Sequence, residues 1–234
     1  MQYDAVIFDN DGVLVRLSPL AVLREASRAA FEAVGVTDPA AAHVEQMMLG
    51  VTPADVREVS EVYSLDPDVF WAARDGAAAD AQISEMRDGR LSCYDDVAAL
   101  EHIRAPRGIV STNQQETIDA VLDHHDFAHL FATAYGREPT IESLRRKKPE
   151  PHYLERAMAD LDAETALFVG DSETDVLAAH RAGIDSAFIR RPHRSDTELD
   201  ASPTYEIETL YDIHAIDGVP VADAATDGGT ESER

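Results

Sequence analysis

Short apolar runs alternate with helical patterns along most of the chain. Four runs have the length of a strand and lie at residues 4–8, 108–111, 166–169 and 186–189. Amphipathic patterns of helical period separate the later runs, at residues 114–125, 150–161 and 173–182. Strands that alternate with helices in this way predict right-handed crossovers, and therefore an α/β fold with a doubly wound parallel sheet.

Residues 17–90 follow a different pattern, with no run typical of a strand. Four times a side chain bearing an oxygen precedes a proline, at Ser18-Pro19, Asp38-Pro39, Thr52-Pro53 and Asp66-Pro67. This pair suits a helix start, because the oxygen caps the first turn and proline lacks only an N–H that would be unpaired. The segment is therefore predicted to be an all-helical insertion between the first and second strands, with residues 1–16 and 91–214 forming the α/β core.

The last part of the chain, residues 215–234, is mostly polar and ends in Gly-Gly-Thr-Glu-Ser-Glu-Arg. Segments of this composition bury too little apolar surface to offset the entropy of ordering the backbone. We expect this tail to be disordered.

The charge balance is strongly acidic, with 45 Asp and Glu residues against 20 Lys and Arg residues and a net charge of -25. Only Lys147 and Lys148 are lysines. This composition is typical of cytosolic proteins from salt-loving archaea, since the Debye length falls to about 3 Å in 1 M salt and screens the repulsion. Such a polyanion is not expected to bind nucleic acids or anionic membranes.

Other features exclude further classes of protein. No apolar run approaches the roughly 20 residues of a membrane helix, and the first residues lack a signal-peptide pattern, so we expect a cytoplasmic protein. The single cysteine, Cys93, excludes an internal disulfide framework and a multi-cysteine zinc site.

Polar residues follow three of the apolar runs: Asp9 and Asp11 the first, Thr112 and Asn113 the second, Asp171 and Asp175 the third. In a parallel sheet all of them reach the carboxyl edge of the strands, where open α/β folds bind ligands. Each cluster also has a structural interpretation. The first could be an acidic turn, the second a strand-to-helix cap, and the third a helix N-terminus capped by Ser172.

The functional interpretation rests on charge. Asp9 and Asp11 stand two residues apart, and Gly12 allows the backbone to turn directly after them. Two neighbouring carboxylates repel each other unless a cation joins them, and Asp171 could complete an oxygen site for Mg2+. Lys147 and Lys148 precede a helix, and their retention in a chain that otherwise uses arginine suggests a need for a compact ammonium group. The alternative for the two lysines is a solvated basic patch.

Taken in order, these segments resemble the motifs of the haloacid dehalogenase superfamily, in its phosphatase branch with a helical cap (phosphoglycolate phosphatase or β-phosphoglucomutase-like). The resemblance covers residues 4 to about 190, and its motifs match Asp9 and Asp11, then Thr112 with Ser111 as the alternative, then Lys148, then Gly170, Asp171 and Asp175. The chain departs from the family pattern at Val13, where threonine is common, and at Cys93–Asp96, where Pro-Gly is often found.

The resemblance implies Mg2+-dependent hydrolysis of a small phosphorylated metabolite. Asp9 would attack phosphorus and form an aspartyl phosphate, and Asp11 would act as general acid and then as general base. Mg2+ would be held by Asp9, Asp171 and the backbone carbonyl of Asp11. The phosphoryl oxygens would be bound by Thr112, Asn113 and Lys148. Asp175 would orient Lys148 or a water molecule on the metal.

Several alternatives share the fold. A 2-haloacid dehalogenase needs neither Asp11 nor a metal, and a phosphonoacetaldehyde hydrolase needs a lysine in the cap, which this chain lacks. A sugar-phosphate mutase keeps every motif, whereas a catalytically idle binding protein usually loses one of the two aspartates. Phosphoglycolate and sugar phosphates are candidate substrates by analogy alone. Seven arginines could meet an anionic group: Arg16, Arg24, Arg28, Arg57, Arg74, Arg87 and Arg90. The sequence does not give the oligomeric state.

Overall fold

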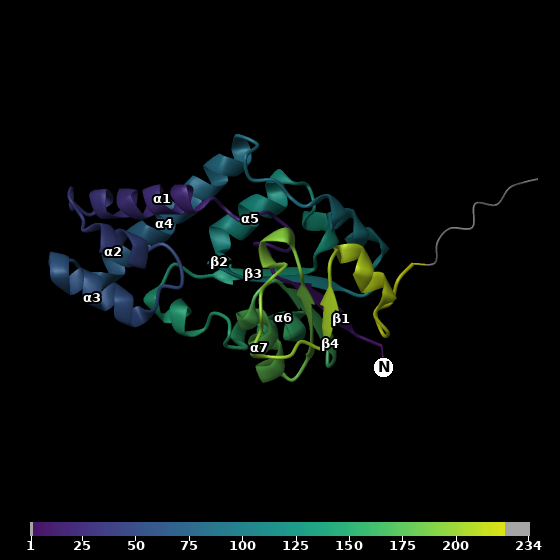
Figure 1. Cartoon of the computed structure of the whole chain (residues 1–234). Coiled ribbons are helices and arrows are strands. Elements are labelled where there is room, and N and C mark those ends of the chain that lie inside the picture. Colours follow the sequence, from purple (N-terminus) through teal and green to yellow (C-terminus); the bar gives the residue numbers. More distant parts are fainter. Residues whose placement is uncertain (1, 223–234) are drawn as a thin grey trace, which may run out of the picture.

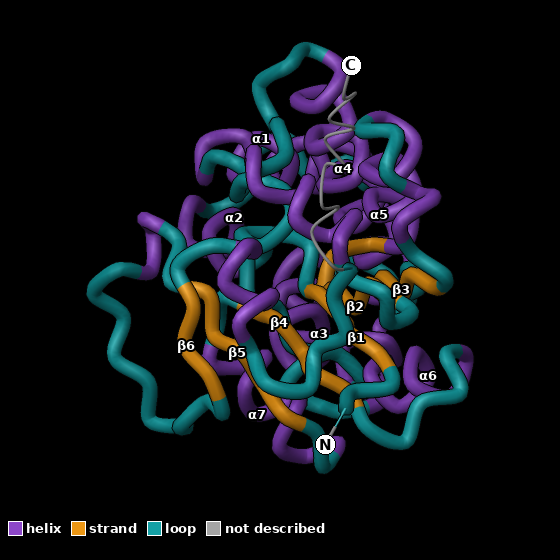
Figure 2. Tube along the Cα trace, turned by 90° about the vertical axis from the view of Figure 1, so that its right-hand side faces the viewer, coloured by secondary structure: helices purple, strands orange, loops and turns teal. Residues whose placement is uncertain are grey.

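The sheet of this protein has six parallel strands in the order β3-β2-β1-β4-β5-β6 within residues 2–222, which the computed structural model describes (Figures 1 and 2). The strands are β1 (Ala5–Phe8), β2 (Arg107–Gln114), β3 (Thr133–Arg137), β4 (Ala166–Gly170), β5 (Asp185–Ile189) and β6 (Tyr205–Ile207). The chain runs outward from β1 in one direction and then from β4 in the other. This change of direction defines a doubly wound sheet and confirms the predicted fold class.

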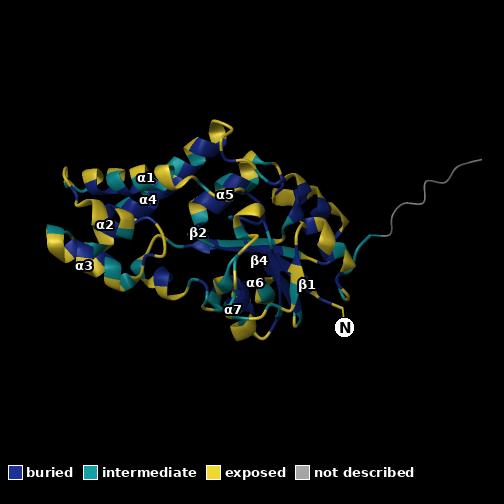
Figure 3. Ribbon diagram, in the orientation of Figure 1, coloured by how far each residue is buried: buried dark blue, intermediate teal, exposed yellow. Residues whose placement is uncertain are grey.

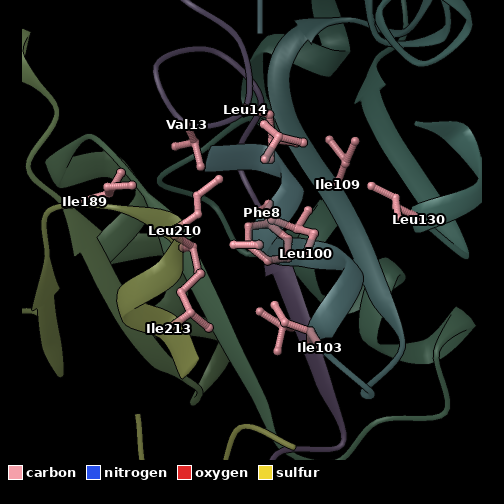
Figure 4. Packing of buried hydrophobic residues seen from close by; sticks show 14 of the residues in the cluster. Phe8, Val13, Leu14, Leu100, Ile103, Ile109, Leu130, Ile189, Leu210 and Ile213 are labelled. Carbon is pink, nitrogen blue, oxygen red and sulfur yellow. The ribbon is translucent and has the colours of Figure 1, made fainter. Parts of the chain in front are cut away.

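Helices cover both faces of the sheet. One face packs against α5 (Gln115–His124) and the 3-10 helices η1 (Asp95–His102) and η5 (Leu210–Ala215). The other packs against α6 (His152–Asp160) and α7 (Glu173–Ala182). Side chains of β1 alternate between the two cores, as a strand requires: Val6 and Phe8 enter the first, and Ala5 and Ile7 the second. Figure 4 shows Phe8 packed among Leu100, Ile109 and Leu210.

Four α-helices lie between β1 and β2 in the chain and form a separate layer beside the sheet (Figure 1). They are α1 (Leu20–Ala33), α2 (Ala41–Gln46), α3 (Pro53–Tyr63) and α4 (Pro67–Arg87), and we call residues 20–87 the helical insertion. It has a core of its own, in which Phe31, Met47, Phe70 and Trp71 are buried. Its helices alternate between buried and exposed positions (Figure 3). No helix within residues 2–222 is both long enough and apolar enough to cross a membrane.

Two of the four predicted helix starts are confirmed. Thr52 forms a capping box with Asp55 at α3, and the Asp66 carboxylate accepts two backbone N–H groups at α4, each with proline following. The prediction was wrong at Ser18 and Asp38, because α1 and α2 begin one to two residues later and have no side-chain cap. The residues at these two N-caps are Pro19 and Ala40, which have no side-chain oxygen to accept a hydrogen bond.

The four predicted strands are confirmed as β1, β2, β4 and β5, and the predicted helices as α5, α6 and α7. Strands β3 and β6 carried no signal in the sequence. Both lie at the edges of the sheet, are short and include several partly exposed positions, so they lack a continuous apolar run. An edge strand is buried on fewer sides than a central one, and its composition is correspondingly mixed.

The chain is ordered beyond the predicted start of the tail. Ile216 and Val219 are buried in the core, and Val221 bridges to Ile103. These contacts hold residues 215–222 against the sheet layer, which differs from the expectation of disorder from residue 215. The remainder of the predicted tail, residues 223–234, lies outside the described residues.

Candidate active site

The polar residues predicted to meet at the carboxyl edge of the sheet do so. Phe8 pairs with Ile109 of β2 and with Val169 of β4, so β1 and β4 end at nearly the same level while β2 extends five residues further, to Gln114. Asp9 directly follows β1 and Asp171 directly follows β4. The register of the sheet therefore brings together side chains that are 162 positions apart in the chain.

Lys148 occupies the centre of this cluster. Its Nζ lies 2.8 Å from Oδ1 of Asp9 and 2.6 Å from Oδ1 of Asp175, and it also donates to the carbonyl of Val110 at 3.3 Å. Only 3% of the Lys148 side chain is exposed. The second oxygen of Asp175 accepts hydrogen bonds from the backbone N–H and the hydroxyl of Ser172. Both oxygens of Asp175 are thus engaged, one in orienting Lys148 and one in capping α7.

Asp171 faces two side chains that the sequence analysis did not identify. Its Oδ2 lies 2.6 Å from Nε2 of His193 and 3.1 Å from Nε of Arg194. Both belong to η4 (Pro192–Arg194), in the basic segment that follows β5. A signal was available, because a segment directly after a parallel strand reaches the same edge of the sheet as the other three clusters.

Gly12 allows the chain to turn close to Asp171. Its φ angle is +78°, in the left-handed region that favours glycine, and its N–H donates to the carbonyl of Val15. A β-carbon at this position would lie 2.4 Å from Oδ2 of Asp171. The turn therefore has no room for any other residue unless Asp171 moves.

Asp11 is held by polar groups at the end of β2. The side-chain amide of Asn113 donates to its two oxygens at 3.3 and 3.1 Å, and the hydroxyl of Ser111 donates to Oδ2 at 3.4 Å. Asn113 in turn donates to Oε1 of Gln82, which comes from α4 of the helical insertion. Gln82 was not identified from the sequence, because the rotation of α4 about its axis decides which side chains meet the core.

Burial has the largest effect on the pKa values of Asp9 and Asp11. Burial raises the pKa of Asp9 well above its usual value; Lys148 opposes this, while Asp175, Asp171 and Asp11 add to it. Burial also raises the pKa of Asp11, and the hydrogen bond from Asn113 partly counters it. For Lys148, burial lowers the pKa, but the charges of Asp175 and Asp9 outweigh burial and the net shift is upward. The site is thus an array of carboxylates short of positive charge.

Three buried carboxylates could hold a metal ion. Asp9, Asp171 and Asp175 each offer an oxygen, and these oxygens lie within 4.8 Å of one another. The third ligand in this group is Asp175, whereas the sequence analysis predicted the backbone carbonyl of Asp11 as the third ligand. Since both oxygens of Asp175 already have partners, the set of Asp9, Asp11 and Asp171 stays our prediction.

A cavity of about 250 Å³ opens between the helical insertion and the edge of the sheet. Asp11, Thr112 and Asn113 form part of its wall on the core side. Thr112 is half-buried there, whereas Ser111 is buried beneath it. Arg74 is the member of the seven arginines considered above that lines this cavity.

Comparison with known proteins places this geometry in context. The family model of haloacid dehalogenase-like hydrolases matches residues 3–183, which include every residue of the site described so far except His193 and Arg194. The chain is 25% identical over 228 residues to the pyrophosphatase PpaX of Anoxybacillus flavithermus, covering 94% of this chain and 99% of that protein. It is 30% identical over 128 residues to PpaX of Oceanobacillus iheyensis, but this match spans 53% of this chain and 58% of the relative.

Solved structures share the whole fold. A predicted phosphoglycolate phosphatase from Haemophilus somnus superposes with a TM-score of 0.65 at 20% identity, covering 92% of this chain and 98% of that one. CbbY from Rhodobacter sphaeroides, crystallised with xylulose-(1,5)bisphosphate, gives a TM-score of 0.67 at 17% identity, covering 90% and 96%. At these identities the likeness concerns the fold alone.

Proposed function

The chain belongs to the haloacid dehalogenase-like hydrolases, and on this basis we propose that it is a Mg2+-dependent phosphohydrolase of small phosphomonoesters that works through an aspartyl phosphate on Asp9. The observation that carries the proposal is the position of Lys148. Its ammonium group lies 2.8 Å from Asp9, at the carboxyl edge of the sheet, where it can neutralise phosphoryl oxygens as the nucleophile approaches.

In the first step a carboxylate oxygen of Asp9 bonds to phosphorus while the bond from phosphorus to the ester oxygen breaks. Asp11, held in place by Asn113, gives its proton to the leaving alkoxide. In the second step Asp11 takes a proton from a water molecule, the water oxygen attacks phosphorus, and Asp9 leaves as a carboxylate with inorganic phosphate as product. Lys148, Thr112 and Asn113 supply donors for the phosphoryl oxygens.

The donor set fits Mg2+. Asp9 and Asp171 are hard oxygen ligands within reach of each other, and their mutual repulsion is relieved by a divalent cation. When bound, the ion would offset the charge of the substrate phosphate and keep Asp9 ionised. Asp175 would hold Lys148 in its orientation. The helical insertion would act as a cap that excludes water while the phosphoryl group is transferred.

The test is release of phosphate from p-nitrophenyl phosphate, a panel of small phosphomonoesters and inorganic pyrophosphate, in molar KCl with and without Mg2+. Pyrophosphate is included because PpaX relatives are named pyrophosphatases. The variant is Asp9→Asn. Its matched control is Asp162→Asn, an exposed residue after α6 whose positive φ suits asparagine.

We expect Mg2+-dependent release by the wild type and the control, and a loss of at least about a thousandfold in Asp9→Asn, because the covalent route requires this carboxylate. Equal release by Asp9→Asn would refute the nucleophile. If the folded wild type released no phosphate from any compound, the mutase alternative would be favoured, and isomerised sugar phosphates would be the product to look for.

A further inference from the structure

The cavity beside Asp11 carries three basic side chains that the proposed chemistry does not use. They are Arg74 from α4, Arg137 at the end of β3, and Lys147, the residue before Lys148. Their gathering is unexpected in a chain whose net charge is -25 and which contains only two lysines. It requires a separate explanation.

Two of the three share a single carboxylate. Arg137 makes a two-pronged contact with Asp75, at 2.7 and 2.9 Å, and Arg74 approaches the same side chain at 3.4 Å. The other contacts of Arg74 are with the carbonyls of Met47 and Met48, which carry no full charge. Only 1% of the Asp75 side chain is exposed, so water contributes little to neutralising the charges of the two arginines.

Lys147 has no carboxylate within ion-pair distance among the described residues. Its Nζ donates to the carbonyl of Val51 at 2.6 Å, in the loop that precedes α3. Burial, then the charges of Arg137 and Arg74, lower the pKa of Lys147 to about 8. The nearby Asp55 and Asp75 act in the opposite direction but do not outweigh the arginines.

The cavity therefore has three cations in its wall, against the carboxylate of Asp11 in the same wall and that of Asp75, which pairs with the two arginines, so positive charge is in excess. It also has an excess of donors. The indole N–H of Trp71, which lies near both arginines, is buried without an acceptor among the described residues. Uncompensated buried charge is costly unless a partner of opposite sign arrives. An anion bound in the cavity would supply that partner.

We propose that Lys147, Arg74 and Arg137 form a subsite for a second acidic group of the substrate, which is therefore a phosphomonoester that also carries a carboxylate or a second phosphate. This inference rests on the proposed function, because Asp11 and Lys147 line the same cavity and one molecule would contact both. The subsite selects among esters by their second acidic group, while Asp9 and Lys148 act on the phosphate that is removed.

The size of the cavity limits the substrate further. Its volume is about 250 Å³. Leu17, Leu20 and Leu49 line the cavity and are themselves partly exposed, so the walls near solvent are apolar. A cavity of this size suits a metabolite of a few carbon atoms.

The test compares three esters that differ in the far group: phosphoglycolate with a carboxylate, 1,3-propanediol bisphosphate with a phosphate, and ethyl phosphate with neither. The variant is Lys147→Gln, measured at one fixed concentration of KCl. The control is Arg145→Gln, which removes a positive charge two positions away from an exposed side chain that pairs with Glu142. Lys147→Arg restores the charge and serves as the rescue.

We expect the wild type to prefer one of the doubly acidic esters, and the preferred ester identifies the far group. Lys147→Gln should lower kcat/KM for that ester by about tenfold to a hundredfold, the usual effect of losing a hydrogen bond to a charged group. For ethyl phosphate the change should stay within about threefold. Arg145→Gln should match the wild type, and Lys147→Arg should recover most of the loss. An equal fall for all three esters would overturn the subsite.

A binding measurement separates this proposal from the proposed function. Phosphonoacetate carries two acidic groups and methylphosphonate one, and neither can be hydrolysed as an ester. Calorimetry should show tighter binding of phosphonoacetate to the wild type, and Lys147→Gln should abolish the difference. If the wild type hydrolysed nothing but kept this difference, the catalytic proposal would fail and the subsite would stand. If phosphonoacetate bound no more tightly than methylphosphonate, the subsite would be wrong.

Discussion

Asp75 joins the helical insertion to the sheet through one buried carboxylate. It lies on α4, and it accepts two hydrogen bonds from Arg137 at the end of β3 and a third, at 3.1 Å, from the side chain of Gln114 at the end of β2. The change Asp75→Asn keeps the shape of the side chain and removes its charge. Arg137 and Arg74 are then left as buried cations without a counter-charge.

The magnitude follows from burial. The exposed fractions of the two partner side chains are 1% for Asp75 and 4% for Arg137, so solvent cannot replace the lost partner. Breaking a buried ion pair by removing one member costs about 3–5 kcal/mol of unfolding free energy. For a chain of this size each kcal/mol lowers the melting temperature by roughly 2–4 °C, so we expect a decrease of roughly 6–20 °C.

The assay is thermal and urea unfolding at two KCl concentrations, with two control variants. Asp80→Asn makes the same change at an exposed position of the same helix and should have little effect. Glu45→Gln breaks the exposed pair with Arg24, whose contribution should be small and should fall as salt rises. The effect of Asp75→Asn should stay nearly constant between the two salt concentrations, because a buried pair is screened little.

The double variant Asp75→Asn with Arg137→Gln decides whether the pair itself is responsible. If the buried charge causes the loss, the double variant should be more stable than the sum of the two single changes predicts, since no unpaired Arg137 remains. Strict additivity, or a loss in Asp75→Asn no larger than in Asp80→Asn, would refute the reasoning.

Three further predictions concern the site. Gly35→Ala should lose about 1–2 kcal/mol of unfolding free energy because of its positive φ, and Gly12→Ala should lose at least as much, because its β-carbon would also meet Asp171. Only Gly12→Ala should also lose phosphatase activity. Equal activity in the two variants would contradict the close approach at Gly12. Mg2+ at a hundred times its dissociation constant should stabilise the wild type by about 2.7 kcal/mol and so raise its melting temperature. It should not change the melting temperature of Asp171→Asn. A full shift in that variant would exclude Asp171 as a ligand. Lys147 has a pKa of about 8 in the folded chain and an ordinary value of 10.5 in the unfolded chain, so between these pH values the unfolded chain binds more protons. The free energy of unfolding should therefore rise with pH in this range. The preference for doubly acidic esters should fall over the same range, because Lys147 loses its charge. Lys147→Gln should flatten both trends in urea titrations and ester assays, and unchanged slopes would show that another group titrates.

The sheet and the edge that carries the candidate site could be predicted because both depend on local patterns. A central parallel strand is buried on both faces, so β1, β2, β4 and β5 appear as apolar runs, and the residues that follow them must meet at one edge. The same reasoning failed for β3, whose partly exposed positions conceal it, and Arg137 at its end was therefore missed. His193 and Arg194 follow β5 and reach the same edge of the sheet, but the local sequence pattern does not show that they contact Asp171.

The contacts between the insertion and the core could not be predicted, for a physical reason. Whether Arg74, Gln82 or one of the other polar residues of α4 faces the sheet depends on the rotation of the helix and on the angle of the whole insertion. Hydrophobic periodicity does not fix that rotation, because α4 is buried on several sides and its buried positions include both apolar and polar residues. The cavity is formed at this interface, so its lining and its charge emerge only from the assembled structure.

The position of the two lysines gives the acidic composition a functional consequence. A net charge of -25 repels an anionic substrate at long range in dilute buffer, but in 1 M salt the Debye length of about 3 Å removes that repulsion. The same screening removes long-range attraction, so binding then depends on groups that contact the substrate directly. The Nζ of Lys148 lies 2.8 Å from Asp9 and Lys147 lines the cavity, so both lysines of the chain lie where the proposed substrate would be contacted directly. We therefore expect the preference for doubly acidic esters to persist in molar KCl, whereas an effect produced by surface arginines would vanish there.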